Sequence, residues 1–408
     1  MGSELPVGRR VAYWRSRRAM SQQVFADAIG KSKSWVDKVE RGVRRLDKLS
    51  TLQDIAVALR IDVELLLGTD PPPAQRTGGA IDPLIGTELD PLRTVLFRYD
   101  AALARTGHTE PSRAALAARV AHAWLAFGHA DYRHLLRTLP GLLSDAQLTR
   151  AAQPDDPAPC RLLGQVYQVT SAVLHKLGEL ATAWLTADRA MTTCRRTADP
   201  LLVASATVAL VRVVSALGRP RHAWEVALAV ADSLAPPDPP TADPEHLRVY
   251  GALLLQAARA TARHGDRHSS ADLLEHAVEI ADSLGDDHQH QGTSFGPTLV
   301  TLTRVTAALD LDEHPDPLRL HRELVVDPAF QRLTLELRAG YLVDVAGGFL
   351  RRNDLPEAGR ALLLADRTAP TEVRHRPAAR STLRTLLRRS SHADPALAHL
   401  AATLRIAL

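Results

Sequence analysis

The chain has 408 residues, of which 45% are hydrophobic, 24% charged and only 4% aromatic. This composition is typical of a folded globular protein, and the length predicts two or more domains. No apolar run approaches the ~20 residues that cross a bilayer, and the N-terminus lacks the apolar core of a signal peptide, so we expect a cytoplasmic protein without a membrane partner. Two cysteines are too few for a disulfide framework.

Positive charge is concentrated at the N-terminus. Residues 1–50 carry twelve Lys/Arg against five Asp/Glu, so the rest of the chain has a net charge of −3 within the total of +4. The chain has five lysines, at positions 31, 33, 38, 48 and 176. A basic end on a near-neutral body indicates an anionic partner for that end. The alternative is solvated charge without a partner.

Short amphipathic segments fill residues 1–68. Ser21 and Ser32 are placed as N-caps, and Gly30 and Gly42 as residues that end helices. Together with the apolar spacing of "VAYWRSRRAM", "DKLSTLQDIAVAL" and "DVELLLG", they predict five short helices, two of them joined by a tight turn. This arrangement predicts a helix-turn-helix domain.

The stretch "MSQQVFADAIGKSKSWVDKVERG" resembles the DNA-binding core of the phage repressor and Cro-like family, the xenobiotic-response-element class of bacterial regulators, and the likeness extends over residues 9–68. In that family the third helix lies in the major groove. The resemblance implies that Gln22 bonds a phosphate. It also implies that Lys33, Ser34 and Lys38 face base edges, because Lys can donate to guanine and Ser serves several bases.

Further DNA contacts are expected after this helix. The resemblance implies that Arg41, Arg44 and Arg45 meet phosphates, which supply position and affinity. Trp35 either stacks on sugar or methyl groups or packs inside the domain.

One ion pair is expected within the domain itself. In this family the residues that correspond to Arg15 and Glu40 form a structural ion pair, so the resemblance does not assign these two charges to DNA.

The assembly follows from the small footprint of one recognition helix. Such a helix reads only about four to six base pairs, so we expect a homodimer on double-stranded DNA with an inverted-repeat operator.

The stretch "GTDPPPAQRTGGA" begins at residue 68 and has no apolar periodicity, which predicts a linker over residues 69–83.

Beyond the linker, residues 84–408 read as Ala/Leu-rich amphipathic helices. Turns recur about forty to fifty residues apart, at Gly178, Gly218, Gly265 and Asn353, and less clearly near Gly128 and Asp310. This spacing predicts an irregular α-solenoid of helix pairs that resembles tetratricopeptide repeats. The predicted fold class is all-α.

The stretches "TSFGPTLVTLTRV" and "RAGYLVDVAGGFLRRNDLPEAGRALLLADRTAPTEVRHRP" are similar to the C-terminal half of large helix-turn-helix regulators of high-GC Gram-positive bacteria. Leu299 stands where those proteins have Asn, so no ligand contact is carried over to it. The resemblance implies a repeat domain that binds a small molecule or a peptide and dimerises.

Three arginines stand six residues before predicted turns: Arg212, Arg259 and Arg304, before Gly218, Gly265 and Asp310. Equal offsets place them on corresponding faces of stacked helices, where a solenoid lines its inner groove. Guanidinium groups there suit a ligand carboxylate or phosphate, because each fork can bind bidentately. The alternatives are pairing with Asp or Glu inside the protein, and chance.

Catalytic and metal-binding patterns are not found. No Gly-rich phosphate loop or nucleophile elbow occurs, and His288 and His290 in "GDDHQHQGTSFGP" are read as part of a polar loop because no second ligand cluster accompanies them. We therefore expect no enzymatic activity, metal or cofactor.

Three functions remain in view. The first is a ligand-responsive transcription regulator. The second is a scaffold of the defence or antitoxin type, whose repeats hold a protein partner and for which DNA binding is secondary. The third is a helical-repeat enzyme.

Overall fold

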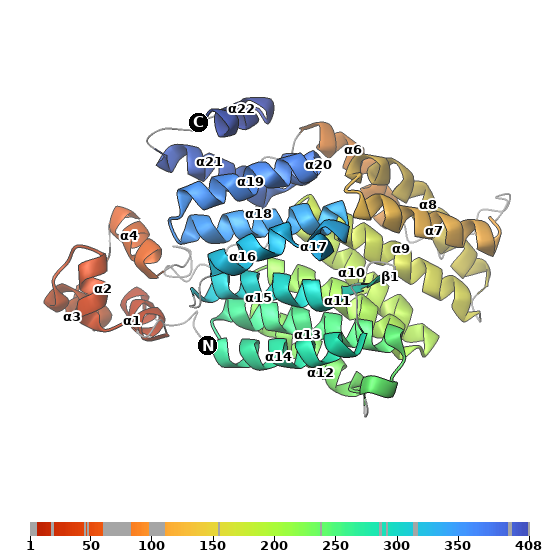
Figure 1. The fold of residues 1–408 in the computed structure, drawn as a ribbon, viewed down its shortest axis with the longest axis horizontal. Coiled ribbons are helices and arrows are strands. Elements are labelled where there is room, and N and C mark those ends of the chain that lie inside the picture. The colour runs from red at the N-terminus through yellow and green to blue at the C-terminus, as the bar shows by residue number, and fades with distance from the viewer. Residues whose placement is uncertain are drawn as a thin grey trace. The chain divides into compact units, whose positions relative to one another are not determined.

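In the computed structural model, the residues described are 6–17, 20–44, 46, 49–59, 83–97, 111–153, 156–236, 239–284, 288–290, 293–312, 317–390 and 394–406. The chain forms two compact units, Met1–Arg76 and Thr77–Leu408. Among the residues described, the regular secondary structure is helical apart from one short hairpin (Figure 1), so the predicted all-α fold is confirmed. The fifth predicted helix of the N-terminal domain, and the predicted linker apart from its last residue, lie outside this set. No described helix is long and apolar enough to span a membrane.

The N-terminal unit contains α1 (Val7–Arg17), α2 (Gln22–Ala28), α3 (Lys33–Glu40) and α4 (Leu49–Leu59). The two predicted N-caps are confirmed: Ser21 Oγ accepts from the backbone N of Val24, and Ser32 Oγ from that of Trp35, each at 3.2 Å. These bonds satisfy amide groups that the first helical turn leaves without a partner.

The core of this unit is small and apolar. Its fully or largely buried side chains are Val11, Phe25, Ala26, Val36, Ile55, Ala56 and Leu59. They come from all four helices, so each amphipathic face is buried and the polar face of α3 is left to solvent.

The second unit is built from helices that run in consecutive pairs. They are α6 (Pro83–Phe97), α7 (Arg113–Gly128), α8 (Tyr132–Ala152), α9 (Pro157–Lys176), α10 (Leu180–Cys194), α11 (Pro200–Ala216), α12 (Pro220–Leu234), α13 (Pro244–His264), α14 (Arg267–Leu284), α15 (Pro297–Leu311), α16 (Pro317–Val326), α17 (Pro328–Arg332), α18 (Leu335–Arg351), α19 (Leu355–Thr368), α20 (Pro370–His375), α21 (Pro377–Arg389) and α22 (Pro395–Thr403). Short 3₁₀ helices lie at Arg195–Thr197 and Pro239–Thr241. Strands β1 (His288–His290) and β2 (Thr293–Phe295) pair antiparallel.

Asp-Pro sequences begin several of these helices. The side chains of Asp156, Asp199 and Asp243 accept from backbone amides of the first turns of α9, α11 and α13, and proline occupies the first helical position. Proline loses no hydrogen bond there, because that amide has no partner within the helix.

The turns between paired helices contain a residue in the left-handed region. These residues are Ala130, Gly178, Gly218, Gly265 and Asn353, and Asp312 takes the same conformation after α15. The predicted turns at Gly178, Gly218, Gly265 and Asn353 are confirmed. The predictions at Gly128 and Asp310 are wrong by two residues, because both residues are still helical. At these two turns Ala130 and Asp312 adopt the left-handed conformation, in which glycine is the usual residue.

Helices near the two ends of this unit contact each other. Tyr132 at the start of α8 donates its hydroxyl to Glu372 on α20, and Thr371 Oγ1 donates to the carbonyl of Ala130 at 2.8 Å. Helix α6 joins the same unit through Arg93, whose Nη2 lies 2.7 Å from Glu179 Oε2. The inner helices therefore surround a common interior.

Candidate DNA-binding surface and ligand cavity

The exposed face of α3 carries the residues predicted to read bases. Lys33, Ser34 and Lys38 are exposed, and their side chains form no hydrogen bond or ion pair with other described residues. Ser34 and Lys38 are four residues apart and so lie on one face of the helix. Trp35 is half-buried and packs against the core, so it fits the packing alternative.

The residues predicted to contact phosphate are partly engaged within the domain. Arg41 Nη1 lies 3.3 Å from Asp37 Oδ2, and the guanidinium carbon of Arg44 lies 5.8 Å from the centre of the Trp35 ring. Both arginines are exposed. Arg45 lies outside the part of the chain that the structure describes.

Arg15 and Glu40 join α1 to α3. Arg15 Nε lies 2.5 Å and its Nη2 3.0 Å from the two carboxylate oxygens of Glu40, and Arg15 Nη1 donates to the Met20 carbonyl at 2.7 Å. The hydrogen bond to Glu40 raises the pKa of Arg15 above its usual value. The predicted structural ion pair is confirmed. Gln22 Nε2 also donates to Glu40, at 2.8 Å.

A cavity of about 650 Å³ lies inside the repeat unit; we call it the central cavity. Most of its lining residues come from the first helices of successive pairs, α9, α11, α13, α15 and α18, and from the start of α21. This is the inner surface that a solenoid of helix pairs offers to a ligand.

The structure brings Arg212 and Arg259 to this cavity, but Arg304 is exposed and is not among the lining residues. The reason is the shifted turn. Counted from Asp312, the position six residues back is Thr306, which does line the cavity. Arg304 lies two residues earlier and is therefore turned by about 200° around α15.

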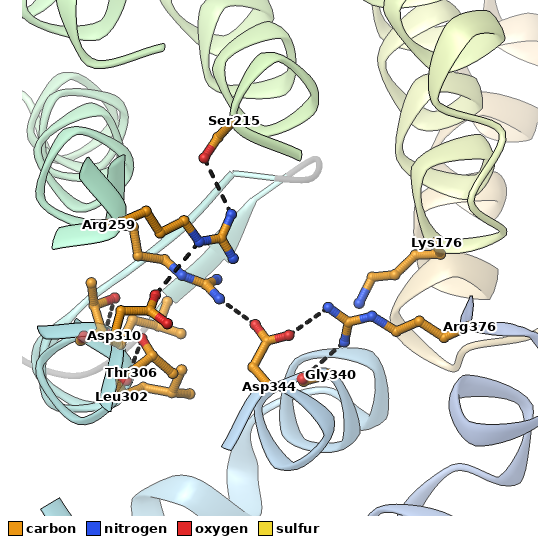
Figure 2. Close-up of polar contacts among 12 residues, drawn as sticks. Lys176, Ser215, Arg259, Leu302, Thr306, Asp310, Gly340, Asp344 and Arg376 are labelled. Atoms are coloured by element: carbon orange, nitrogen blue, oxygen red, sulfur yellow. Dashed lines mark hydrogen bonds and ion pairs between the residues drawn. The ribbon is translucent and has the colours of Figure 1, made fainter. Parts of the chain in front are cut away.

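Asp344 on α18 is shared by two arginines of the cavity wall. It accepts from Arg259 on one side and from Arg376 on the other, with Arg376 Nη2 at 2.6 Å from Oδ1 (Figure 2). Arg376 Nη1 also donates to the Gly340 carbonyl at 2.9 Å. Burial acts to raise the pKa of Asp344, but the surrounding arginines outweigh it and hold the pKa well below its ordinary value.

A second carboxylate of the wall, Asp310, is also shared. Arg351 Nη2 lies 2.5 Å from Asp310 Oδ1, and Arg263 Nε lies 3.5 Å from Oδ2. Arg263 Nη1 also donates to Ser215 Oγ at 3.2 Å. These arginines thus belong to ion pairs that join α13, α15 and α18.

Lys176 is the lysine that stands far from the N-terminal cluster. It is buried, and its Nζ lies 2.5 Å from Glu336 Oε1 and 2.9 Å from Glu372 Oε1. A Cβ on the neighbouring Gly340 would lie 2.8 Å from this Nζ, so the site is tight and suits a compact ammonium group. Lys176 stands alone in the sequence, and nothing near it in the chain indicates these partners.

The residues described form neither a candidate metal site nor a reactive thiol site. None of them form a group of three or more His, Cys, Asp or Glu that could hold a metal ion. The side chains of His288 and His290 lie outside the description. Cys160 and Cys194 are free and buried, and burial raises the pKa of Cys194 to about 11.

Comparison with known proteins assigns the first unit. A family model described as "Helix-turn-helix domain" matches residues 6–67, which include α1 to α4. No curated protein matches the chain. Among solved structures, the chain is similar to Bacillus thuringiensis PlcR in complex with the peptide PapR7 and DNA, at 12% identity and a TM-score of 0.35, covering 85% of this chain and 98% of that chain. Residues 6–67 of this protein are therefore similar to the helix-turn-helix domain that this family model describes.

Proposed function

We propose that this protein is a sequence-specific DNA-binding transcription regulator. The observation that carries the proposal is the match of residues 6–67 to the helix-turn-helix domain, combined with the exposed Lys33, Ser34 and Lys38 on α3. In such domains the corresponding helix enters the major groove. The excess of seven positive charges in residues 1–50 favours a polyanionic partner.

Each residue of this surface has a separate role in the proposal. Lys33 and Lys38 donate to guanine O6 and N7, while Ser34 serves either a donor or an acceptor on a base edge. Arg41, Arg44 and Arg45 contact phosphates and set position and affinity.

Gln22 can contact a phosphate without leaving Glu40. Its amide nitrogen carries two protons, of which one is directed to Glu40 Oε2. The second remains for a phosphate oxygen at the start of α2, so the Arg15–Glu40 pair orients a DNA contact as well as joining two helices.

The protein is proposed to act as a homodimer on an inverted-repeat operator, because one α3 helix reads too few base pairs for a specific site. The repeat unit is proposed to supply the contact between subunits and to bind a small molecule or a short peptide that alters DNA affinity. The volume of the central cavity, about 650 Å³, lies in the range typical of small-molecule sites. A repeat unit that holds a protein partner is the competing function, and a stable co-purifying protein would favour it.

The test uses the purified full-length protein. Its preferred site is selected from random DNA, and binding to that site and to unrelated DNA is measured by fluorescence anisotropy at several salt concentrations. Lys33→Ala or Lys38→Ala should cost about 1–3 kcal/mol on the selected site and relax base preference. Arg44→Ala should weaken selected and unrelated DNA alike and flatten the salt dependence.

Val24→Ala serves as a control, because Val24 is 55% exposed but carries no hydrogen-bonding group. It should bind like the wild type. If the lysine variants weakened unrelated DNA as much as the selected site, Lys33 and Lys38 would be phosphate contacts. If no site emerged from the selection, sequence-specific DNA binding itself would be refuted.

A further inference from the structure

A second, much smaller hollow of about 20 Å³ adjoins the central cavity; we call it the side pocket. His175, Val208 and Arg212 line both spaces. The remaining lining residues are mostly polar or aromatic: Trp124, Gln168, Ser171, Ala172, Ser205, Ala209, Val213 and Thr293. The side pocket has room for one group of about the size of a water molecule.

Arg212 differs from the other cations of the central cavity wall. Lys176, Arg259, Arg263, Arg351 and Arg376 each pair with a carboxylate. Arg212 forms no hydrogen bond or ion pair with any residue that the structure describes.

The nearest carboxylates do not compensate Arg212. Glu336 and Asp344 act on it only at longer range, and both are already bound by other cations. Burial lowers the pKa of Arg212 below its usual value. A partly buried charge without a partner destabilises the fold, so its presence is explained if a ligand supplies the missing anion.

The side pocket holds unused hydrogen-bonding capacity. Trp124 Nε1 and His175 Nδ1 are buried and have no hydrogen-bond partner. Indole N–H is only a donor, so it requires an acceptor. Burial, followed by the nearby Arg212, lowers the pKa of His175 well below its usual value, which keeps the ring neutral. The side pocket therefore suits a small neutral group that contains an acceptor.

We propose that the central cavity binds an organic anion whose carboxylate or phosphate pairs with Arg212 and whose adjacent hydroxyl or carbonyl oxygen enters the side pocket beside Trp124 and His175. The guanidinium fork can hold either anion bidentately. This inference rests on the proposed role of the repeat unit as a ligand-binding domain, and it names the chemical class of the ligand.

The experiment measures binding of matched probes to the full-length protein in the absence of DNA, by isothermal titration calorimetry. Malate and succinate differ by one hydroxyl next to a carboxylate, and glycerol 3-phosphate and propyl phosphate form a corresponding phosphate pair. Within at least one pair, the hydroxylated probe should bind at least tenfold more tightly than its partner. The pair that binds distinguishes a carboxylate ligand from a phosphate ligand.

Three variants locate the site. Arg212→Met should lower the affinity for the bound probe at least tenfold and leave the unfolding midpoint without ligand unchanged or raised. Trp124→Phe should remove the preference for the hydroxylated probe. Arg304→Met is the matched control, because Arg304 is exposed and outside the cavity lining, and it should behave like the wild type.

Three results would overturn the proposal: no binding of any of the four probes to the wild type, equal affinity in Arg212→Met and wild type, or equal affinity within each pair of probes, which would mean that the side pocket holds only a water. If Arg212→Met did not fold, Arg212→Gln would provide the same comparison. None of these outcomes bears on DNA binding, which is measured separately.

Discussion

His321 is buried in the repeat unit and makes the stability of that unit depend on pH. Its Nδ1 lies 2.9 Å from the Tyr341 hydroxyl, and its ring packs against Phe349. Burial lowers the pKa of His321 from 6.5 to about 4. The unfolded chain therefore binds a proton between pH 6.5 and 4 that the folded chain does not, so stability should fall by roughly 3 kcal/mol as the pH falls through this window.

Urea unfolding at a series of pH values checks this expectation. His321→Gln keeps a polar partner for Tyr341 but does not titrate, so it should flatten the slope between pH 6.5 and 4. The part that remains is assigned to His175, which is also buried and neutral, and, at the acid end of the window, to Asp344, whose pKa is lower in the folded than in the unfolded chain. His399→Gln is the control, because His399 is exposed on α22. An unchanged slope in His321→Gln would contradict the assignment.

The structural roles of individual residues could be predicted where neighbouring residues in the sequence or the family resemblance determine them. Ser21 and Ser32 could be placed as N-caps because a cap bonds an amide of the adjacent turn. The Arg15–Glu40 pair could be expected because the family resemblance supplied it. Lys176 could not be assigned, since its partners Glu336 and Glu372 lie far along the chain.

At the scale of elements, the left-handed turn residue defines each helix pair. Gly265 has φ 88°, and a Cβ there would meet no atom within 4 Å. Gly265→Ala should therefore reveal the conformational cost alone, about 1–2 kcal/mol. Asn353→Gly at the corresponding turn, where φ is 63°, should change stability by only a few tenths of a kcal/mol, because Asn tolerates this conformation.

Chemical unfolding of both variants measures the two effects. The free energy of unfolding should fall clearly for Gly265→Ala and stay close to the wild-type value for Asn353→Gly. Equal effects at the two turns would mean that packing, and not backbone conformation, determines these positions.

The same turns explain why the inner face was only partly predictable. Turns that contain Gly or Asn could be located from the sequence, whereas those at Ala130 and Asp312 were expected two residues too early. Alanine is a strong helix former, so nothing local marks Ala130 as the end of a helix. An error of two residues hardly changes a helix boundary but turns a side chain about 200°. The early turn at Asp310 therefore placed Arg304 on the cavity-lining face of α15, where Thr306 lies.

At the scale of the repeat unit, the contact between α8 and α20, near its two ends, could not be predicted. Tyr132 and Glu372 are 240 residues apart in the chain, and periodicity reports only which neighbours along the sequence pack together. The central cavity depends on this contact, because α9 and α18 approach each other across it through Lys176 and Glu336. The sequence could predict an inner face but not the pairing of most of its charges.

The final prediction concerns the assembly on DNA. Two copies of α3 bound to an inverted repeat must face successive turns of the same groove, so half-sites should be centred about 10–11 base pairs, or a small multiple, apart. Light scattering at micromolar concentration should give twice the 44.3 kDa of one chain, and footprinting should show two protected half-sites. Inserting five base pairs between them should greatly weaken binding by placing the half-sites on opposite faces of the duplex. Inserting ten base pairs returns them to the same face and should restore binding. A monomer that protects a single half-site would refute the dimer and leave the base contacts of Lys33 and Lys38 to be judged on their own.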